Sequence, residues 1–197
     1  MAESLERICV FCGSSSGARE IYREAAISLG RTLAQRGIGL VYGGSHLGLM
    51  GTLADTVMAA RGAVTGVMPR LLVDKEAAHT GLPDLRIVGS MHERKALMAD
   101  LACGFIALPG GFGTLEEFCE VLTWAQLGVH AKPCGLLNVA GFYDPLLALL
   151  DHAVAERFLK PQNRDLVIAD DDVARLLDRM ACFHAPQVSK WIGREEV

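Results

Sequence analysis

The amino-acid sequence predicts a single α/β domain built on a doubly wound, Rossmann-like parallel sheet. Two observations predict this class: short apolar segments alternate with helix-length amphipathic segments, and the apolar segments are nearly continuous in hydrophobic residues. Such continuous runs are typical of strands that helices bury on both faces. The length of 197 residues fits one domain with a tail. We assign residues 1–183 to a nucleotide-binding domain and residues 184–197 to a polar C-terminal tail.

Seven short apolar segments predict the strands. In chain order they are residues 8–11, 38–42, 64–68, 85–88, 105–108, 134–139 and, as the shortest, 166–168. Amphipathic segments predict helices over residues 18–36, 47–61, 91–102, 114–127, 144–156 and 171–182. Gly37 follows the first helix at the position where a glycine commonly ends one. Residues 70–84 show neither pattern and are expected to be irregular. Because β and α segments alternate throughout, the architecture is doubly wound.

Composition and charge exclude several classes of protein. Hydrophobic residues make up 51% of the chain and charged residues 21%, which is ordinary globular usage and rules out disorder. The net charge of −4 argues against a nucleic-acid binder, which usually carries a basic field. The longest uncharged stretch, residues 101–115, is too short to span a bilayer, and the N-terminus lacks the pattern of a signal peptide. We therefore expect a cytoplasmic protein with reduced cysteines and with no membrane or nucleic-acid partner.

Glycine is in clear excess, at 21 of 197 residues or roughly 11%, against an average of about 7%. Three glycine-rich turns each follow a predicted strand, at residues 12–17, 43–51 and 109–114. Ligands of doubly wound sheets bind outside the carboxyl ends of the strands, where these turns lie. None of the turns carries the Lys-Ser/Thr pair of a P-loop, and Glu116 occupies the third glycine position of a dinucleotide fingerprint. A standard NAD site is therefore not expected.

The segment PGGFGTLEE at residues 109–117 is the strongest candidate for a binding site. A strand ends at Pro109, and a helix is expected to begin at Thr114, so exposed N–H groups at the helix start can bind an anion. The absence of side chains at Gly110, Gly111 and Gly113 would let a phosphate approach closely. The alternative is a tight turn with a cap and no ligand.

Two roles are open for Glu117. Thr114 and Glu117 match the T-x-x-E pattern of a capping box, in which the glutamate only returns a hydrogen bond to the helix start. A carboxylate one turn from an anion site is also well placed for chemistry on a molecule that carries a phosphate.

The segment SMHERK at residues 90–95 is the second candidate. Ser90 and Glu93 match another capping box, and Arg94 and Lys95 follow in the first turns of the helix. Cations are unfavourable near the positive end of a helix dipole, which indicates an anionic partner. The alternative is an ordinary solvated helix face.

Two weaker patterns do not predict chemistry. Cys9 and Cys12 match C-x-x-C, but Cys9 falls inside a predicted strand, whereas a redox pair opens a helix. The six histidines show no paired ligand spacing and no second cysteine pair exists, so no metal site is expected.

PGGFGTLEE and MHERK together make the chain resemble the Lonely Guy family of cytokinin riboside 5′-monophosphate phosphoribohydrolases. The resemblance covers nearly the whole chain, including VFCGSSSG, YGGSHLGLMG and TWAQLGVHAKPCGLLNVAGFYD. It implies hydrolysis of the N-glycosidic bond of a nucleoside 5′-monophosphate, such as an N6-substituted AMP, to a free base and ribose 5-phosphate. It also implies a homodimer and no metal or organic cofactor. A lone PGGxGT would be less specific, because molybdenum-cofactor carrier-like proteins share that kind of loop.

By the family pattern, Arg94 and Glu117 match the catalytic pair. Loss of the base builds positive charge on the ribose, which a fixed carboxylate near C1′ would stabilise. Arg94 could act in the reaction or clamp the phosphate. The positions expected to contact the substrate are Gly44, Ser45, Glu76, Met91, Lys95, Gly110, Gly111, Phe112, Gly113, Thr114, Leu115, Glu116 and Thr123.

The sequence also bears on two other functions. Family members often carry a lysine decarboxylase label, which these residues do not support, because pyridoxal enzymes need a Schiff-base lysine and a carboxylate for the ring nitrogen. A non-catalytic nucleotide or cofactor carrier could use the same anion loop, but the joint presence of Arg94 and Glu117 favours an enzyme. Departures from the family pattern are modest: Phe112 stands where tyrosine is common, and Arg157 replaces the usual glycine before Phe158.

Overall fold

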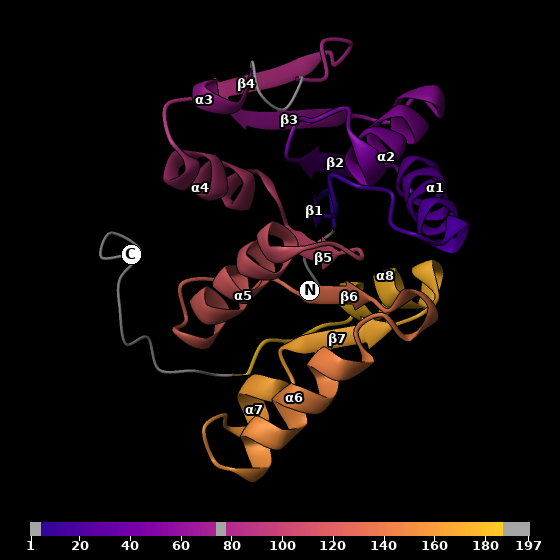
Figure 1. The fold of residues 1–197 in the computed structure, drawn as a ribbon. Coiled ribbons are helices and arrows are strands. Elements are labelled where there is room, and N and C mark those ends of the chain that lie inside the picture. The colour runs from indigo at the N-terminus through magenta and orange to yellow at the C-terminus, as the bar shows by residue number, and fades with distance from the viewer. Residues whose placement is uncertain (1–4, 74–77, 187–197) are drawn as a thin grey trace.

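A computed structural model describes residues 5–73 and 78–186 of the chain. The described residues form one sheet of seven parallel strands in the order β4-β3-β2-β1-β5-β6-β7, with helices on both faces (Figure 1). The predicted doubly wound α/β class is confirmed. Within these residues, none of the helices has the length and apolar character needed to cross a bilayer.

The strands agree closely with the apolar segments of the sequence. They are β1 (Arg7–Phe11), β2 (Gly39–Tyr42), β3 (Val64–Pro69), β4 (Asp84–Val88), β5 (Gly104–Ala107), β6 (Cys134–Leu137) and β7 (Val167–Asp170). The longer helices are α1 (Glu20–Gln35), α2 (Gly48–Ala59), α4 (Met91–Leu101), α5 (Phe112–Gln126), α6 (Asp144–Ala155) and α8 (Val173–Ala181). The short ones are α3 (Arg70–Val73), η1 (Val139–Gly141) and α7 (Pro161–Arg164).

Two expectations about local structure were wrong or incomplete. Residues 70–84 are not wholly irregular, because α3 and the first residue of β4 fall within them. The sequence did not predict α7, because a four-residue helix is too short to show a 3.6-residue period. Gly37 does end α1 in the left-handed region, at φ +69°, as its position predicted.

The sheet separates two apolar layers. Side chains of β1 alternate between them: Ile8 and Val10 face α1, α2 and α8, whereas Cys9 and Phe11 face α4 and α5. Cys12 belongs to the first layer, so Cys9 and Cys12 point to opposite faces of the sheet. Both thiols are free and buried, and burial raises the pKa of each. They behave as small hydrophobic residues, as expected.

The strand order places the three glycine-rich turns next to one another. β1 lies between β2 and β5, and the chain reverses its direction of travel across the sheet between β1 and β5. The turns after these strands touch through backbone: the amide of Gly13 donates to the carbonyl of Pro109 at 3.1 Å, and the amide of Leu49 donates to the carbonyl of Gly13 at 3.1 Å. A topological switch point of this kind is where doubly wound proteins bind ligands.

Candidate functional site

A buried ion pair between α4 and α5 is the centre of the candidate site. Nη1 of Arg94 donates to Oε1 of Glu117 at 2.6 Å, and each side chain is only 11% exposed. The two helices lie side by side on one face of the sheet, and the glycine loop at residues 109–111 leads directly into α5 (Figure 1). The sequence predicted that these residues act together, and the structure brings them into contact.

The guanidinium of Arg94 lies against the backbone of β3 and of the turn after β2. Its Nε donates to the carbonyl of Val67 in β3 at 3.2 Å. On another side it lies against Gly43, where an added Cβ would collide with Nη2 of Arg94. Glycine at position 43 therefore makes room for the guanidinium, a role that the glycine-rich composition of the turn did not reveal.

Burial raises the pKa of Glu117 above its ordinary value, and the positive charge and hydrogen bond of Arg94 oppose that shift. Arg94 thus stabilises the ionised form of a carboxylate that would otherwise favour protonation. An ionised carboxylate held in a partly closed position can stabilise positive charge that develops on a substrate.

The capping role of Glu117 is wrong. Helix α5 begins at Phe112 instead of Thr114, its N-cap is Gly111, and no side chain caps it. Thr114 is thus already inside the first turn, where it is buried, and Glu117 lies a turn further on with its carboxylate on Arg94. The serine half of the second capping box is confirmed, because the Ser90 hydroxyl accepts a hydrogen bond from the amide of Glu93 at 3.1 Å. The Glu93 carboxylate accepts from the amide of Gly89 at 2.6 Å instead of from that of Ser90.

Lys95 is bound to carboxylates of α5. Its Nζ lies 2.6 Å from Oε1 of Glu116 and 2.9 Å from Oε1 of Glu120. Burial favours the neutral amine, but the hydrogen bonds that the ammonium donates to these carboxylates outweigh it and raise the pKa of Lys95. The solvated-face alternative for Arg94 and Lys95 is therefore wrong, since both cations are paired across the helices. Glu120 was not predicted from the sequence, although it lies four residues after Glu116 on the same helix face.

The glycine loop presents the amino end of α5. The first N–H groups of a helix have no intrahelical acceptor, and no side chain caps this one. An added Cβ at Gly111 or Gly113 would meet nothing within 4 Å, so space is open in front of both residues. Gly110 differs, because its Cβ would collide with the side chain of Thr114. Open space beside unpaired amides is what an anion site requires.

The remaining predicted positions fall into two groups. Gly44 (φ +78°) and Ser45 (fully buried) lie in the turn after β2, where the Gly44 carbonyl accepts from the amide of His79 at 2.9 Å. Met91 is the first residue of α4, and Phe112, the first of α5, is 94% exposed. Leu115 and Glu116 follow in the first turns of α5.

One predicted substrate contact is not joined to the ion pair, and another lies outside the residues that the structure describes. Thr123 lies about 9 Å beyond Glu117 along α5, and its hydroxyl donates to the carbonyl of Cys119 in its own helix at 2.8 Å. Glu76 falls outside the described residues.

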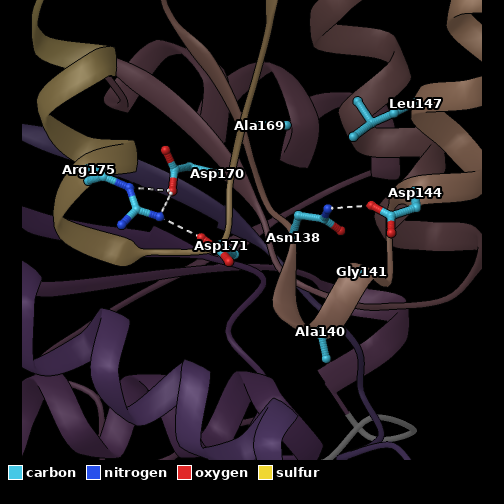
Figure 2. Close-up of a pocket in the computed structure, with 9 residues that line it drawn as sticks. All are labelled: Asn138, Ala140, Gly141, Asp144, Leu147, Ala169, Asp170, Asp171 and Arg175. Atoms are coloured by element: carbon cyan, nitrogen blue, oxygen red, sulfur yellow. Dashed lines mark hydrogen bonds and ion pairs between the residues drawn. The ribbon is translucent and has the colours of Figure 1, made fainter.

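A pocket of about 530 Å³ lies at the carboxyl ends of β6 and β7 and contains none of the predicted site residues. Figure 2 shows that its polar groups face one another: Arg175 lies 2.8 Å from Asp170 and 2.6 Å from Asp171, and Asn138 donates to Asp144 at 2.7 Å. These groups already satisfy each other. Within residues 5–73 and 78–186, this pocket included, no group of three or more His, Cys, Asp or Glu side chains is arranged to hold a metal ion.

Comparisons with known proteins point to one family. A family described as "Possible lysine decarboxylase" matches residues 50–180. A probable cytokinin riboside 5′-monophosphate phosphoribohydrolase of Oryza sativa subsp. japonica is 54% identical over 174 residues, which are 88% of this chain and 77% of the relative. A cytokinin riboside 5′-monophosphate phosphoribohydrolase of Arabidopsis thaliana is 48% identical over 178 residues, covering 90% of this chain and 78% of the relative.

Solved structures give a more distant likeness. The molybdenum cofactor carrier protein of Chlamydomonas reinhardtii superposes with a TM-score of 0.68 at 21% identity, over 91% of this chain and 100% of that one. At this level of identity the likeness shows the fold alone.

Proposed function

The chain belongs to the Lonely Guy family of cytokinin riboside 5′-monophosphate phosphoribohydrolases, and from this premise we propose that it hydrolyses the N-glycosidic bond of adenosine 5′-monophosphates. Water adds to C1′ of the ribose, the base departs with the bonding electrons and gains a proton, and the products are a free base and ribose 5-phosphate. The proposal covers both unsubstituted adenine and N6-substituted adenines as the departing base. The single observation that carries it is the buried pair of Glu117 and Arg94 beside the open amino end of α5.

Glu117 is the catalytic carboxylate in this proposal. Cleavage of the glycosidic bond builds positive charge on the ribose ring, and an ionised carboxylate near C1′ stabilises that charge and orients the attacking water. Loss of such a group costs about 3 kcal/mol or more of barrier, which is on the order of a hundredfold in rate.

Arg94 is a positioning residue in this proposal, which gives it neither a direct part in the reaction nor the role of a phosphate clamp. Its Nε donates to the carbonyl of Val67 and its Nη1 to Glu117, while its Nη2 lies beside Gly43. A guanidinium held this way orients Glu117 and favours its ionised form. The phosphate then binds at the amides of residues 111–114 and serves as remote binding energy for the reaction at C1′.

The decarboxylase label finds no support in the state of Lys95. A Schiff-base lysine needs a depressed pKa to act as a nucleophile. Lys95 has the opposite environment, since Glu116 and Glu120 both bind its ammonium group and raise its pKa. The ammonium is suited to holding the face of α5 against α4.

The carrier hypothesis keeps only the likeness in fold to proteins at about 21% identity. The paired Glu117 and Arg94 favour turnover over storage, and the experiment below separates the two.

The assembly and location follow the sequence expectation: we propose a cytoplasmic homodimer that requires no cofactor, and sedimentation velocity on the purified chain tests the dimer.

Product analysis of a conservative variant tests the proposal. Wild type is expected to release free adenine from AMP, and Glu117→Gln is expected to fold and bind AMP but to release base at least about a hundredfold more slowly. Glutamine keeps the size and hydrogen-bonding capacity of the side chain while removing its charge. Glu156→Gln, at an exposed carboxylate after α6, is the matched control and should behave as wild type.

Two results would contradict the proposal. Base release at the wild-type rate by Glu117→Gln would remove the catalytic role of this residue. AMP binding by the wild type without release of adenine or an N6-prenylated adenine from the matching nucleotide would favour the carrier.

A further inference from the structure

A buried tyrosine at the start of α6 contacts the strand end that leads into the glycine loop. Tyr143 is only 1% exposed, and its hydroxyl donates to the carbonyl of Leu108 at 2.6 Å. Leu108 lies one residue beyond the end of β5 and directly before Pro109. The hydrogen bond therefore holds the point at which the strand becomes the loop.

The tyrosine is itself fixed from behind. Its amide donates to Oδ1 of Asn138 at 2.7 Å, and the Nδ2 of Asn138 donates to Asp144 at 2.7 Å (Figure 2 shows the latter contact). The backbone amide of Asn138 in turn donates to the carbonyl of Asp170 in the neighbouring strand at 2.8 Å. A chain of hydrogen bonds thus runs from β7 through Asn138 and Tyr143 to Leu108.

Two successive carbonyls at the loop entrance are held from opposite sides. The carbonyl of Leu108 accepts from Tyr143, and the carbonyl of Pro109 accepts from the amide of Gly13 in the turn after β1. Because the ring of Pro109 fixes its φ, the orientation of the Leu108 peptide is transmitted directly to the following residues. The next residues are Gly110 and Gly111, which have no side chains to anchor them.

We infer that Tyr143 is a positioning residue that sets the orientation of the phosphate-binding loop. This inference rests on the proposed function of the site and adds a residue to it. Tyr143 touches neither the nucleotide nor the reacting atoms: it acts through Leu108 and Pro109 on the amides at the start of α5. Its effect should therefore fall on recognition of the phosphate and leave the chemistry at C1′ unaffected.

The chain supplies a matched control in a second buried tyrosine. Tyr42 is 0% exposed and ends β2, but its hydroxyl has no hydrogen-bond partner within the part of the chain that the structure describes. Tyr143→Phe and Tyr42→Phe each remove one buried hydroxyl and keep the ring. Only the first removes a hydrogen bond to the loop entrance.

The test compares kcat/KM for AMP and for adenosine in the same preparation. Tyr143→Phe should lower the AMP value about tenfold or more, through KM, because a small displacement of binding groups is costly. Its adenosine value should change less than about twofold, so the AMP-to-adenosine ratio falls. Tyr42→Phe should keep the wild-type ratio. The ratio does not depend on the folded fraction, so partial unfolding of a variant cannot mimic the effect.

An unchanged AMP-to-adenosine ratio in Tyr143→Phe would overturn the inference. Equal losses on both substrates would mean a general structural effect, and no loss on either would mean that the hydrogen bond does not affect the loop.

A binding measurement separates this inference from the proposed function. In the Glu117→Gln background, adding Tyr143→Phe should raise the Kd for AMP about tenfold, whereas adding Tyr42→Phe should not. This result can hold even if the wild type releases no base, in which case the proposed hydrolysis fails and the loop inference stands. An unchanged Kd for AMP would overturn the loop inference alone.

Discussion

Arg94 and Glu117 form a salt bridge between α4 and α5, the helices that precede and follow β5 in the chain. Arg94 lies on α4, before β5, and Glu117 lies on α5, after it, 23 positions along the chain. The pair therefore ties the two helices that enclose the carboxyl end of β5. Because both side chains are nearly buried, neither can lose its partner without leaving a charge in a poorly solvated position.

Breaking this pair from one side should destabilise the fold more than replacing both members. Arg94→Met or Glu117→Leu alone should lower the free energy of unfolding by about 3 kcal/mol, because each leaves a buried charge uncompensated. The double variant should lose less than the sum of the two single variants and should be inactive. Urea unfolding of the three variants checks this. Additive losses would contradict the idea that the cost comes from the unpaired charge.

The pH dependence should report the raised pKa of Glu117. Burial raises that pKa above 4.5, against the opposing effect of Arg94. A carboxyl with a raised folded-state pKa contributes stability that is complete below its unfolded value and is lost as the pH rises through the folded value. Relative to Glu117→Gln, the wild type should therefore lose stability as the pH rises from about 4.5. Activity requires the ionised form, so the acid limb of kcat/KM should lie above pH 4.5.

Unfolding curves at several pH values are the cleaner measurement. The second ionisation of the substrate phosphate lies near pH 6 and also enters the kinetic profile, whereas it does not enter the stability of the free protein. A stability difference between wild type and Glu117→Gln that stays constant across this range would contradict the raised pKa.

Two glycines of the anion loop should separate folding from binding. At Gly110 an added Cβ would collide with Thr114, whereas at Gly113 it would meet nothing within 4 Å. Gly110→Ala should therefore be less stable in thermal unfolding. Gly113→Ala should fold as wild type yet bind AMP more weakly, because its methyl group would occupy space reserved for the phosphate. Wild-type AMP affinity in Gly113→Ala would argue against phosphate binding at this helix start.

Replacing the residue after the C-cap of α6 should increase the stability of the fold. Arg157 follows that helix at φ +63°, in the left-handed region that disfavours side chains. Arg157→Gly should raise the free energy of unfolding by about 1 kcal/mol. Gly37→Ala is the reciprocal control, at φ +69° with nothing within 4 Å of the added Cβ, and should lower it by about as much. Two changes of the same sign would contradict a purely conformational cause.

Sequence reasoning predicted most of the fold because the signals were long and regular. All seven strands followed apolar runs, and the longer helices followed their amphipathic segments. Contacts between residues that are far apart in sequence leave no local pattern, so they could not be predicted. Three such contacts are that of Gly43 with Arg94, that of Lys95 with its second carboxylate, and the hydrogen bond from Tyr143 to Leu108. The misplaced start of α5 had a local cause, since glycine can cap a helix without a side-chain signal.

The three glycine-rich turns contact one another through backbone hydrogen bonds, and these bonds oppose their separation by local unfolding. The amides of Gly13 and Leu49 are bound to carbonyls of neighbouring turns, so neither can exchange with solvent until at least two turns separate. Active-site loops often open at low energetic cost. Here the backbone of the three glycine-rich turns should resist hydrogen–deuterium exchange nearly as long as the central strands, while the exposed residues around Phe112 exchange freely. A nucleotide would then encounter a preformed surface. Selection for a new base would act on the exposed residues and leave the three turns unchanged.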